Sequence, residues 1–282
     1  KFDDVDRWDL HQVTVDDTKR LIDDLSPKTS AGPDGVSYRL IKSLKFEIAE
    51  AITRLTNASI TSGIFHRDWK ISKIIPVPKK GSKKDQNNYR PVALASNIGK
   101  LVEGAVQKQI SRHLEEILPS TMYGFRKNRG TVDALVSVLD NVKMKLNSGM
   151  KIAIVALDAS AAFDVLDHDL VLGSLAIIGA GETTIKWLRN YLTDRYSFVD
   201  IDGSCSARWK VEIGAIQGGL VSPDLYNIGS LTQTMWNDYT DSVAFADDEM
   251  EVVSAESEEE CQQLAKRAAE DMSLWYDAVG LT

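Results

Sequence analysis

Two adjacent aspartates, Asp247 and Asp248, stand between two apolar runs in the stretch DSVAFADDEMEVVSA. On both sides, apolar and polar residues alternate as they would in two half-buried strands, which predicts a β-hairpin with the carboxylates at its tip. Asp is also a good turn former, so a solvated acidic turn is the competing interpretation. A third carboxylate, Asp158, ends the apolar run KIAIVALD. That run predicts a buried central strand.

Three carboxylates that meet at one edge of a sheet would repel one another unless cations lay between them. Hard divalent ions with oxygen ligands are the natural compensation, and Mg²⁺ also takes substrate phosphates as ligands. Two such ions about 3.5–4 Å apart would activate an attacking hydroxyl and stabilise a leaving pyrophosphate. Asp158, Asp247 and Asp248 are therefore candidate metal ligands. For Asp158 taken alone, a strand-ending Asp that caps a helix remains the alternative.

The elements that must position these aspartates are long helices mixed with an apparently antiparallel sheet, which indicates an α+β fold. One long amphipathic helix is predicted from about residue 40 to Gly63, with Leu40 and Leu44 on its buried stripe. The stretch ISKIIPVP (Ile71–Pro78) contains two prolines, which favours an edge strand or a finger-like extension. Further helices are predicted at about residues 14–25, 97–118, 131–148, 170–178, 183–192, 225–236 and 257–279.

Length and composition exclude several classes of protein. The chain has 282 residues, and its six Trp, eight Tyr and seven Phe argue against disorder. No apolar run approaches the roughly 18 residues of a membrane span. Two distant cysteines and four histidines offer no zinc-like spacing, and they fit a reducing compartment. Because the chain starts at Lys1 without a signal-like segment, we expect a piece of a larger polypeptide that is intracellular and not secreted.

Charge is distributed unevenly along the chain. The net charge is −8, yet residues 66–129 carry 14 basic and 5 acidic side chains, whereas residues 241–282 carry 2 basic and 12 acidic ones. A basic block inside an acidic protein predicts a surface for phosphates, and a solvated face of scattered lysines is its alternative.

Six segments, taken in order, resemble the reverse transcriptase domain of non-LTR, LINE-type retrotransposons. The likeness runs from about Ser30 to Thr282. The segments are GPDG (32–35), WKISKIIPVPKKGSKKDQNNYRPVALASNIGKLVE (69–103), YGFRKNRGTVDAL (123–135), LDASAAFDVLDH (157–168), GAIQGGLVSPDLYNI (214–228) and FADD (245–248). The sequence departs from the family where Phe245 replaces the usual Tyr, Ile216 a Pro and Met122 a Gln.

The resemblance implies an α+β right-hand polymerase palm, with an antiparallel sheet backed by helices, plus fingers. Residues 1–150 would form an N-terminal extension and the fingers, with the helix at about 97–118 packing towards the palm. Residues 151–282 would form the palm, with a helical insertion at about 168–195. The family continues beyond this point into a thumb, so we expect the thumb to be absent from this chain.

The resemblance also implies roles for individual residues. Asp158, Asp247 and Asp248 would hold two Mg²⁺ ions, for which Mn²⁺ would substitute. Either Lys79 or Lys80 would grip the triphosphate with Arg90, whose planar fork suits phosphate. The remaining assignments are Gln217 and Gly218 against the incoming nucleotide, Phe163 beneath its sugar, and Phe245, Arg126, Lys127 and Arg129 on nucleic acid. Ordinary turns are the alternative for the glycines and for the basic residues.

By this resemblance the chain is an RNA-templated DNA polymerase core acting on an RNA template, a DNA primer and dNTPs. Its partners would include the rest of a larger polypeptide, with a thumb and an endonuclease, and no membrane. It would act in the nucleus or in a ribonucleoprotein particle. One alternative is an RNA-dependent RNA polymerase, which tends to have Asp where this chain has Phe163. The other is a non-catalytic, polymerase-like nucleic-acid-binding scaffold, which would have no need of the three carboxylates.

Overall fold

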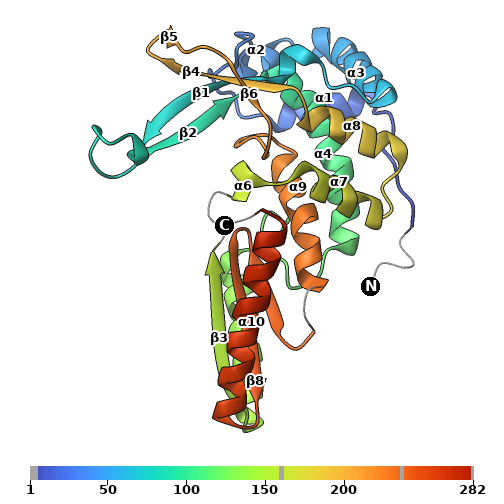
Figure 1. Cartoon of the computed structure of the whole chain (residues 1–282). Coiled ribbons are helices and arrows are strands. Elements are labelled where there is room, and N and C mark those ends of the chain that lie inside the picture. The colour runs from blue at the N-terminus through green and yellow to red at the C-terminus, as the bar shows by residue number, and fades with distance from the viewer. Residues whose placement is uncertain (1–5, 159–161, 236–237, 281–282) are drawn as a thin grey trace. The chain divides into compact units, whose positions relative to one another are not determined.

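The computed structural model describes residues 6–158, 162–235 and 238–280, which divide into two compact units (Figure 1). The first unit comprises Lys1–Arg112 and Leu175–Ser222, and the second His113–Ser174 and Pro223–Thr282. This division differs from the predicted domains 1–150 and 151–282, because the helix after residue 130 packs on the sheet of the second unit. Within the described residues, no helix is both long and apolar enough to cross a bilayer.

The first unit begins with three helices, α1 (Val15–Asp24), α2 (Tyr38–Ser43) and α3 (Lys45–Ser62). Thr14 and Asp17 form a capping box at the start of α1, which satisfies amide groups that the first turn leaves unpaired. The prediction of one helix from residue 40 to Gly63 is wrong, since the chain breaks at Leu44 with ψ 21°. The break leaves Leu44 39% exposed. Gly63 ends α3 in the left-handed region, at φ 67°.

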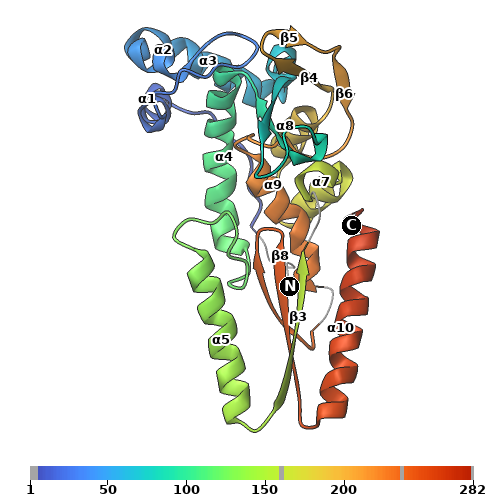
Figure 2. The same ribbon diagram turned by 90° about the vertical axis from the view of Figure 1, so that its left-hand side faces the viewer.

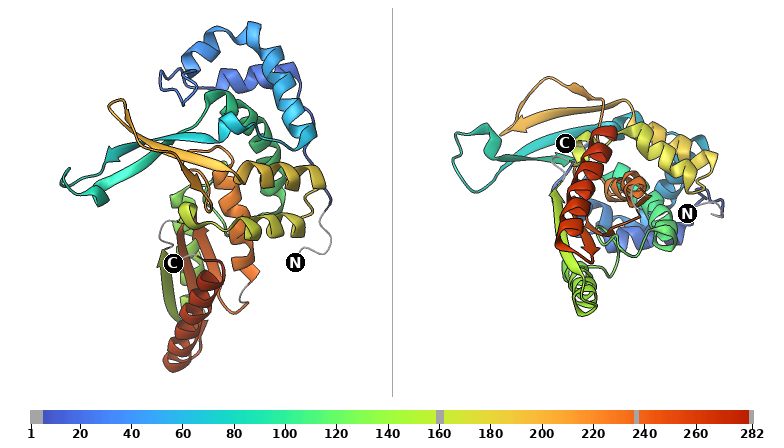
Figure 3. Two further views of the ribbon diagram at one scale, coloured as in Figure 1. Left: turned by 45° about the horizontal axis from the view of Figure 1, so that its top comes forward. Right: turned by 60° about the horizontal axis from the view of Figure 1, so that its bottom comes forward.

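The sheet of the first unit contains β1 (Ile71–Pro78), β2 (Tyr89–Leu94), β4 (Arg195–Ile201), β5 (Ser204–Cys205) and β6 (Trp209–Val211). Its order is β2-β1-β4-β5, with β6 also pairing with β4. Of the two alternatives predicted for β1, an edge strand or a finger-like extension, the edge strand is therefore wrong. The pairing of β1 with β4 stops at Ile74, however, so Pro76 and Pro78 lie where β2 is the only neighbour. Prolines that donate no hydrogen bond are tolerated there. Figure 3 shows the β1–β2 hairpin extending away from the helices of its unit.

Further helices follow the first three helices and the sheet of the first unit in the description, and α4, α7 and α9 each contain residues of both units. Ser96 caps α4 by accepting a hydrogen bond from the backbone N–H of Gly99 at 3.0 Å. α7 and α8 occupy the region predicted as a helical insertion. The elements are α4 (Asn97–Ile117), α7 (His168–Ile177), α8 (Glu182–Leu192), α9 (Ser222–Gly229) and the 3₁₀ helices Arg67–Lys70 and Gln86–Asn88.

The second unit is a three-stranded antiparallel sheet in the order β3 (Lys151–Asp158), β8 (Asp248–Ala255) and β7 (Asp241–Phe245). Helices α5 (Thr131–Asn147) and α10 (Glu258–Ala278) lie on opposite sides of it (Figure 2). The prediction of a buried central strand at residues 151–158 is wrong, because among the described strands β3 pairs with β8 alone. Ile154 is accordingly 49% exposed.

Alternation along β8 divides the core of this unit between the two helices. Val252 packs with Val243 and with Ala134 and Val138 of α5. On the other side, Tyr226 packs with Met272 and Trp275 of α10 and with Val279, which follows the helix. The short helix α6 (Ala162–Val165) and the 3₁₀ helix Ser230–Met235 complete the unit. Both faces of the sheet are therefore covered by helices, while its strand ends carry the candidate carboxylates.

Candidate active site

The tip of the β7–β8 hairpin carries the paired aspartates, as the sequence predicts. Phe245 pairs with Asp248, so Ala246 and Asp247 form a two-residue turn. Ala246 has φ 57°, a conformation that such tight hairpin turns require at their first position and that residues other than Gly adopt rarely. The turn thus fixes the backbone on which both carboxylates are mounted.

Asp158 is the last residue of β3 and pairs with Asp248 in the β3–β8 ladder. Directly opposite residues point to the same face of a sheet, so these two side chains are neighbours. Asp158, Asp247 and Asp248 are all exposed, and none pairs with a Lys or Arg side chain of the described residues. Within the same residues, no three acidic, His or Cys side chains lie close enough together to hold a metal ion. The donors themselves are the hard oxygen ligands that Mg²⁺ prefers.

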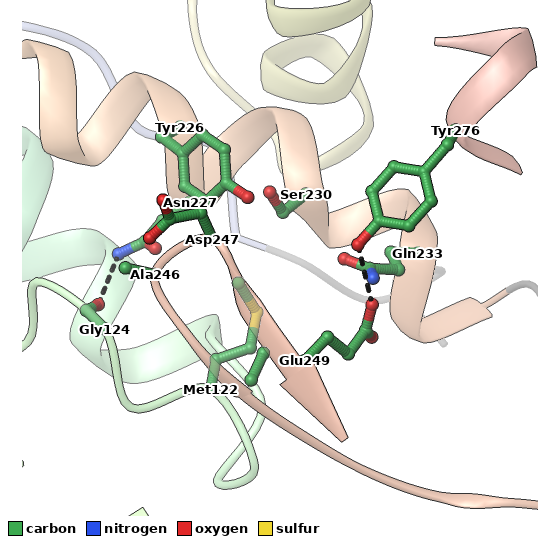
Figure 4. A pocket seen from close by; sticks show the side chains of 11 residues that line it. Met122, Gly124, Tyr226, Asn227, Ser230, Gln233, Ala246, Asp247, Glu249 and Tyr276 are labelled. Carbon is green, nitrogen blue, oxygen red and sulfur yellow. Dashed lines mark hydrogen bonds between the residues drawn. The ribbon is translucent and has the colours of Figure 1, made fainter. Parts of the chain in front are cut away.

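A short segment before α5 supports the hairpin from its open edge. The backbone N–H of Ala244 donates to Thr121 O at 3.0 Å, and that of Tyr123 donates to Ala244 O at 2.8 Å. Gly124 then lies against the turn, since a Cβ there would fall 2.1 Å from the backbone N of Ala246. Asn227 of α9 donates to Gly124 O at 3.1 Å (Figure 4). Only glycine fits at residue 124.

A small cavity of about 10 Å³ lies beside Asp247, and the side chains of Tyr226, Glu249 and Tyr276 line it (Figure 4). The Tyr276 hydroxyl donates to Glu249 at 3.4 Å. Burial and the neighbouring Glu251 carboxylate raise the pKa of Glu249 to about 8. Burial, with the charges of Asp247, Glu249 and Asp158, raises the pKa of Tyr226 to about 12. Both groups therefore favour their neutral forms beside the exposed aspartates.

The three basic residues predicted to contact nucleic acid occupy different environments. The guanidinium of Arg126 is buried and donates to the carbonyl oxygens of Leu118, Pro119 and Met122, and its side chain pairs with Glu115 at 3.0 Å. This burial favours a structural role for Arg126.

Arg129 donates to Ser120 O at 2.6 Å and lies over the Tyr123 ring, whereas Lys127 is exposed. Of the three predicted contacts, Lys127 has the side chain most accessible to a template.

The basic residues predicted to grip a triphosphate gather at the end of the β1–β2 hairpin. Arg90 of β2 pairs with Val77, and the backbone N–H of Lys79 donates to Asn88 O at 2.6 Å. Lys79, Lys80 and Arg90 are exposed. Strand alternation places Lys79 on the same face as Arg90 and Lys80 on the other. The structure thus brings Lys79 and Arg90 together.

The loop that contains Gln217 and Gly218 is shaped by its glycines. Both residues are exposed, and Gly218 has φ 102°, in the region that favours glycine. Gly219 closes a turn by donating to Ile216 O at 3.0 Å. A Cβ at Gly219 would lie 2.7 Å from Ser222 Oγ and 2.8 Å from the Tyr191 hydroxyl. The backbone here packs too closely for any larger residue.

Glu103 of α4 anchors the same loop, and the sequence analysis did not single it out. It is 1% exposed and accepts a hydrogen bond from the backbone N–H of Leu220 at 2.9 Å. Burial raises the pKa of its carboxyl, while the charges of Arg195 and Lys100 and the Leu220 N–H act in the opposite direction. A glutamate among the apolar residues Leu101, Val102, Ala105 and Val106 is the only signal in the sequence, and the partner is 117 residues away.

The two phenylalanines predicted to contact nucleotide or nucleic acid are half-buried. Phe163 packs against the α10 side of the core, and its ring centroid lies 5.5 Å from that of Tyr226. Phe245 packs against the α5 side, with Val243 and Val252. Neither side chain is fully enclosed, so each retains surface for a ligand. Residues 159–161, between Asp158 and α6, lie outside the described residues.

The fold and these residues define an α+β protein in which Asp158 and Asp248 are paired at the ends of two neighbouring strands and Asp247 lies in the adjoining turn. Residues 77–282 match the model of the family described as reverse transcriptase (RNA-dependent DNA polymerase). The match covers well over half of the chain, and the chain therefore belongs to the reverse transcriptase family. The family resemblance predicted from the sequence is confirmed.

Three relatives illustrate the likeness. The RNA-directed DNA polymerase from mobile element jockey of Drosophila melanogaster is 27% identical over 223 residues, which are 78% of this chain and 24% of the relative. The probable RNA-directed DNA polymerase from transposon BS of the same species is 26% identical over 78% of this chain and 24% of the relative. The Pol polyprotein from the type-1 retrotransposable element R1 of Bradysia coprophila is 26% identical over 95% of this chain and 26% of the relative. This chain spans about a quarter of their length.

Proposed function

We propose that this chain is the core of an RNA-directed DNA polymerase, which extends a DNA primer on an RNA template. The observation that carries the proposal is the pairing of Asp158 with Asp248, next to Asp247 in the hairpin turn, in a member of the reverse transcriptase family. We infer that the sheet of the second unit is the palm and that the β1–β2 hairpin belongs to the fingers.

Asp158, Asp247 and Asp248 would hold divalent cations, Mg²⁺ or in its place Mn²⁺. When bound, such ions supply charge stabilisation for phosphoryl transfer and lower the pKa of an attacking hydroxyl. The support is the chemistry of the donors, since three exposed carboxylates face no cationic side chain among the described residues. The neutral neighbours Tyr226 and Glu249 add little negative charge and leave the aspartates as the main ligands.

Nucleotide binding would depend on a second group of residues. Lys79 is the better candidate for the triphosphate than Lys80, because strand alternation places it on the same face as Arg90. Gln217 and Gly218 would contact the incoming nucleotide, where missing side chains permit close approach. Phe163 would lie against the sugar, and its half-buried ring leaves no polar partner for a 2′-hydroxyl.

The substrates and partners follow from the same proposal. Lys127 would contact the template backbone, and the primer and dNTPs would complete the complex. Because the relatives are about four times longer, the working protein would include further domains of a larger polypeptide. A nucleus or a ribonucleoprotein particle is the compartment that fits an enzyme copying a retrotransposon.

Primer extension on an RNA template tests the proposal. The chain should add dNTPs in the presence of Mg²⁺, stop when EDTA is added, and add rNTPs much more slowly. Equal use of rNTPs would favour an RNA-dependent RNA polymerase. If neither is added, Mn²⁺ binding followed by electron paramagnetic resonance still tests the carboxylate site, and absence of binding would favour the non-catalytic scaffold.

A further inference from the structure

Three aromatic rings from separate segments meet beside the catalytic hairpin in the second unit. They are Phe125, which precedes α5, Phe163 of α6 and Tyr226 of α9, and the Phe125 ring also contacts that of Tyr226, at a centroid distance of 6.3 Å. The centroid of the Phe163 ring is 5.6 Å from that of Phe125, at an interplanar angle of 78°, and 5.5 Å from that of Tyr226. Phe125 therefore contacts Phe163 edge to face, the geometry that aromatic pairs prefer.

Phe125 is unusual in both its exposure and its backbone. Its side chain is 45% exposed, so burial in the core does not account for a large apolar ring at this position. Its φ is 59°, in the left-handed region that bulky residues rarely adopt. Strained backbone that is held in place by its surroundings is found most often at functional sites.

The chain on both sides of Phe125 is fixed, so its ring cannot move freely. Gly124 lies against the backbone of Ala246, and Asn227 donates to its carbonyl oxygen. Arg126 is held by three carbonyl oxygens and Glu115. The same segment therefore touches the turn that carries Asp247 and presents the Phe125 ring to Phe163.

We propose that Phe125 is a specificity-positioning residue, which holds the Phe163 ring in the place from which it excludes ribonucleotides. The inference rests on the proposed function, because Phe163 acts on the sugar only in a polymerase. If the Phe163 ring could rotate away from the sugar, a 2′-hydroxyl would fit in its place. The edge of the Phe125 ring, packed against Phe163, prevents that rotation. Tyr226 contacts both rings but is buried in the core and serves packing as well.

The test compares incorporation of dATP and ATP on the same RNA template. Phe125→Ala should raise the ratio of ATP to dATP efficiency roughly two- to twelvefold, the value of one edge-to-face aromatic contact. Phe125→Leu retains apolar volume and should give a smaller rise, which guards against a folding defect. Phe125→Gly removes the ring and relieves the strained φ, so it should be more stable than Phe125→Ala with the same rise.

A double-mutant cycle decides whether Phe125 acts through Phe163. In a Phe163→Ala background the ratio should already be high, and Phe125→Ala should add nothing to it. Phe46→Ala is the matched control, because Phe46 is also an exposed phenylalanine, at 75%, and lies on α3 of the first unit. Its ratio should equal that of the wild type.

Two results would overturn the inference: an unchanged ratio in folded Phe125→Ala, or an equal rise in both backgrounds. If the wild type does not extend a primer, the proposed function fails in that assay. The relative affinity for dATP and ATP, measured by calorimetry in the presence of primer–template, then decides the inference in the same variants. An affinity ratio that Phe125→Ala leaves unchanged would overturn it as well.

Discussion

Carboxylates occupy opposite environments in the two units. In the first unit Glu103 is buried, accepts a backbone hydrogen bond from Leu220, and faces the charges of Arg195 and Lys100. In the second unit Asp158 and Asp247 are exposed at strand ends, without a cationic side chain among the described residues. The protein itself supplies the first carboxyl with a hydrogen bond and two nearby opposite charges, whereas the other two face solvent.

The difference in burial distinguishes a carboxylate that stabilises the fold from carboxylates that remain available to bind a cation. A buried charge must have its partners in place when the chain folds, because isolated burial is too costly. Exposed carboxylates side by side destabilise the fold slightly through repulsion and remain available to a cation. Removing a structural carboxylate should therefore cost stability, while removing a catalytic one should cost activity alone.

The largest expected effect is on activity. Asp247→Asn should lower primer extension by about a thousandfold or more, since loss of a metal ligand removes several kcal/mol of transition-state stabilisation. The turn tolerates Asn, so the melting temperature should stay the same or rise. Steady-state extension and calorimetry on one preparation measure both quantities. Extension at the wild-type rate would remove Asp247 from the metal site.

The opposite behaviour is expected at Glu103. Glu103→Ala leaves the buried Arg195 without this counter-charge and should lower the free energy of unfolding by about 3–5 kcal/mol. Glu103→Gln keeps an acceptor for the Leu220 N–H and should lose less. Urea denaturation measures the change, with Asp158→Asn as the matched control that should lose nothing. A Glu103→Ala protein as stable as the wild type would break the comparison.

Sequence reasoning succeeded where the signal is local. The alternation around FADD predicted the hairpin, and the helix predicted at about residues 14–25 is α1. The family motifs carried the assignment to reverse transcriptases, which the family match confirms. Turn chemistry and capping act over a few residues, so the chain itself records them.

Sequence reasoning failed where the outcome depends on distant partners. The apolar run that ends at Asp158 was expected to be a buried central strand, but β3 lies at an edge of the described sheet. Arg126 has the residue type of a template contact, yet its guanidinium is buried among backbone carbonyls. Glu103 went unnoticed because its partner Leu220 is 117 residues away. No local pattern specifies such contacts.

The same comparison between a buried and an exposed charge applies to the basic residues Arg126 and Lys127, where the expected changes in stability are smaller. Arg126→Ala leaves backbone carbonyls without a donor and should lower the free energy of unfolding by about 2–3 kcal/mol. Lys127→Ala should change stability by less than about 0.5 kcal/mol. It should instead reduce the dependence of log affinity for an RNA–DNA duplex on log salt by about 0.7–0.9. An exchange of these two results would show that Arg126 is the template contact.

A pH dependence of stability should originate at Glu249. Its pKa is about 8 in the folded protein and 4.5 in the reference state, so between these values the folded state binds more protons than the unfolded one. The free energy of unfolding should therefore fall as pH rises through this window, by at most about 1.4 kcal/mol per pH unit, and level off above it.

The Glu249→Gln variant has no proton to lose at this position and should flatten the profile. A residual slope of the same sign should remain from Glu103, whose pKa is also raised by burial. Urea denaturation in EDTA at several values between about pH 5 and 8 measures the free energy of unfolding as a function of pH. Glu256 is exposed, so the Glu256→Gln variant is the control that should keep the wild-type slope. A Glu249→Gln profile as steep as the wild type would mean that this carboxyl is ionised in the fold, and that the second unit contains a buried charge without the opposite charges that face Glu103.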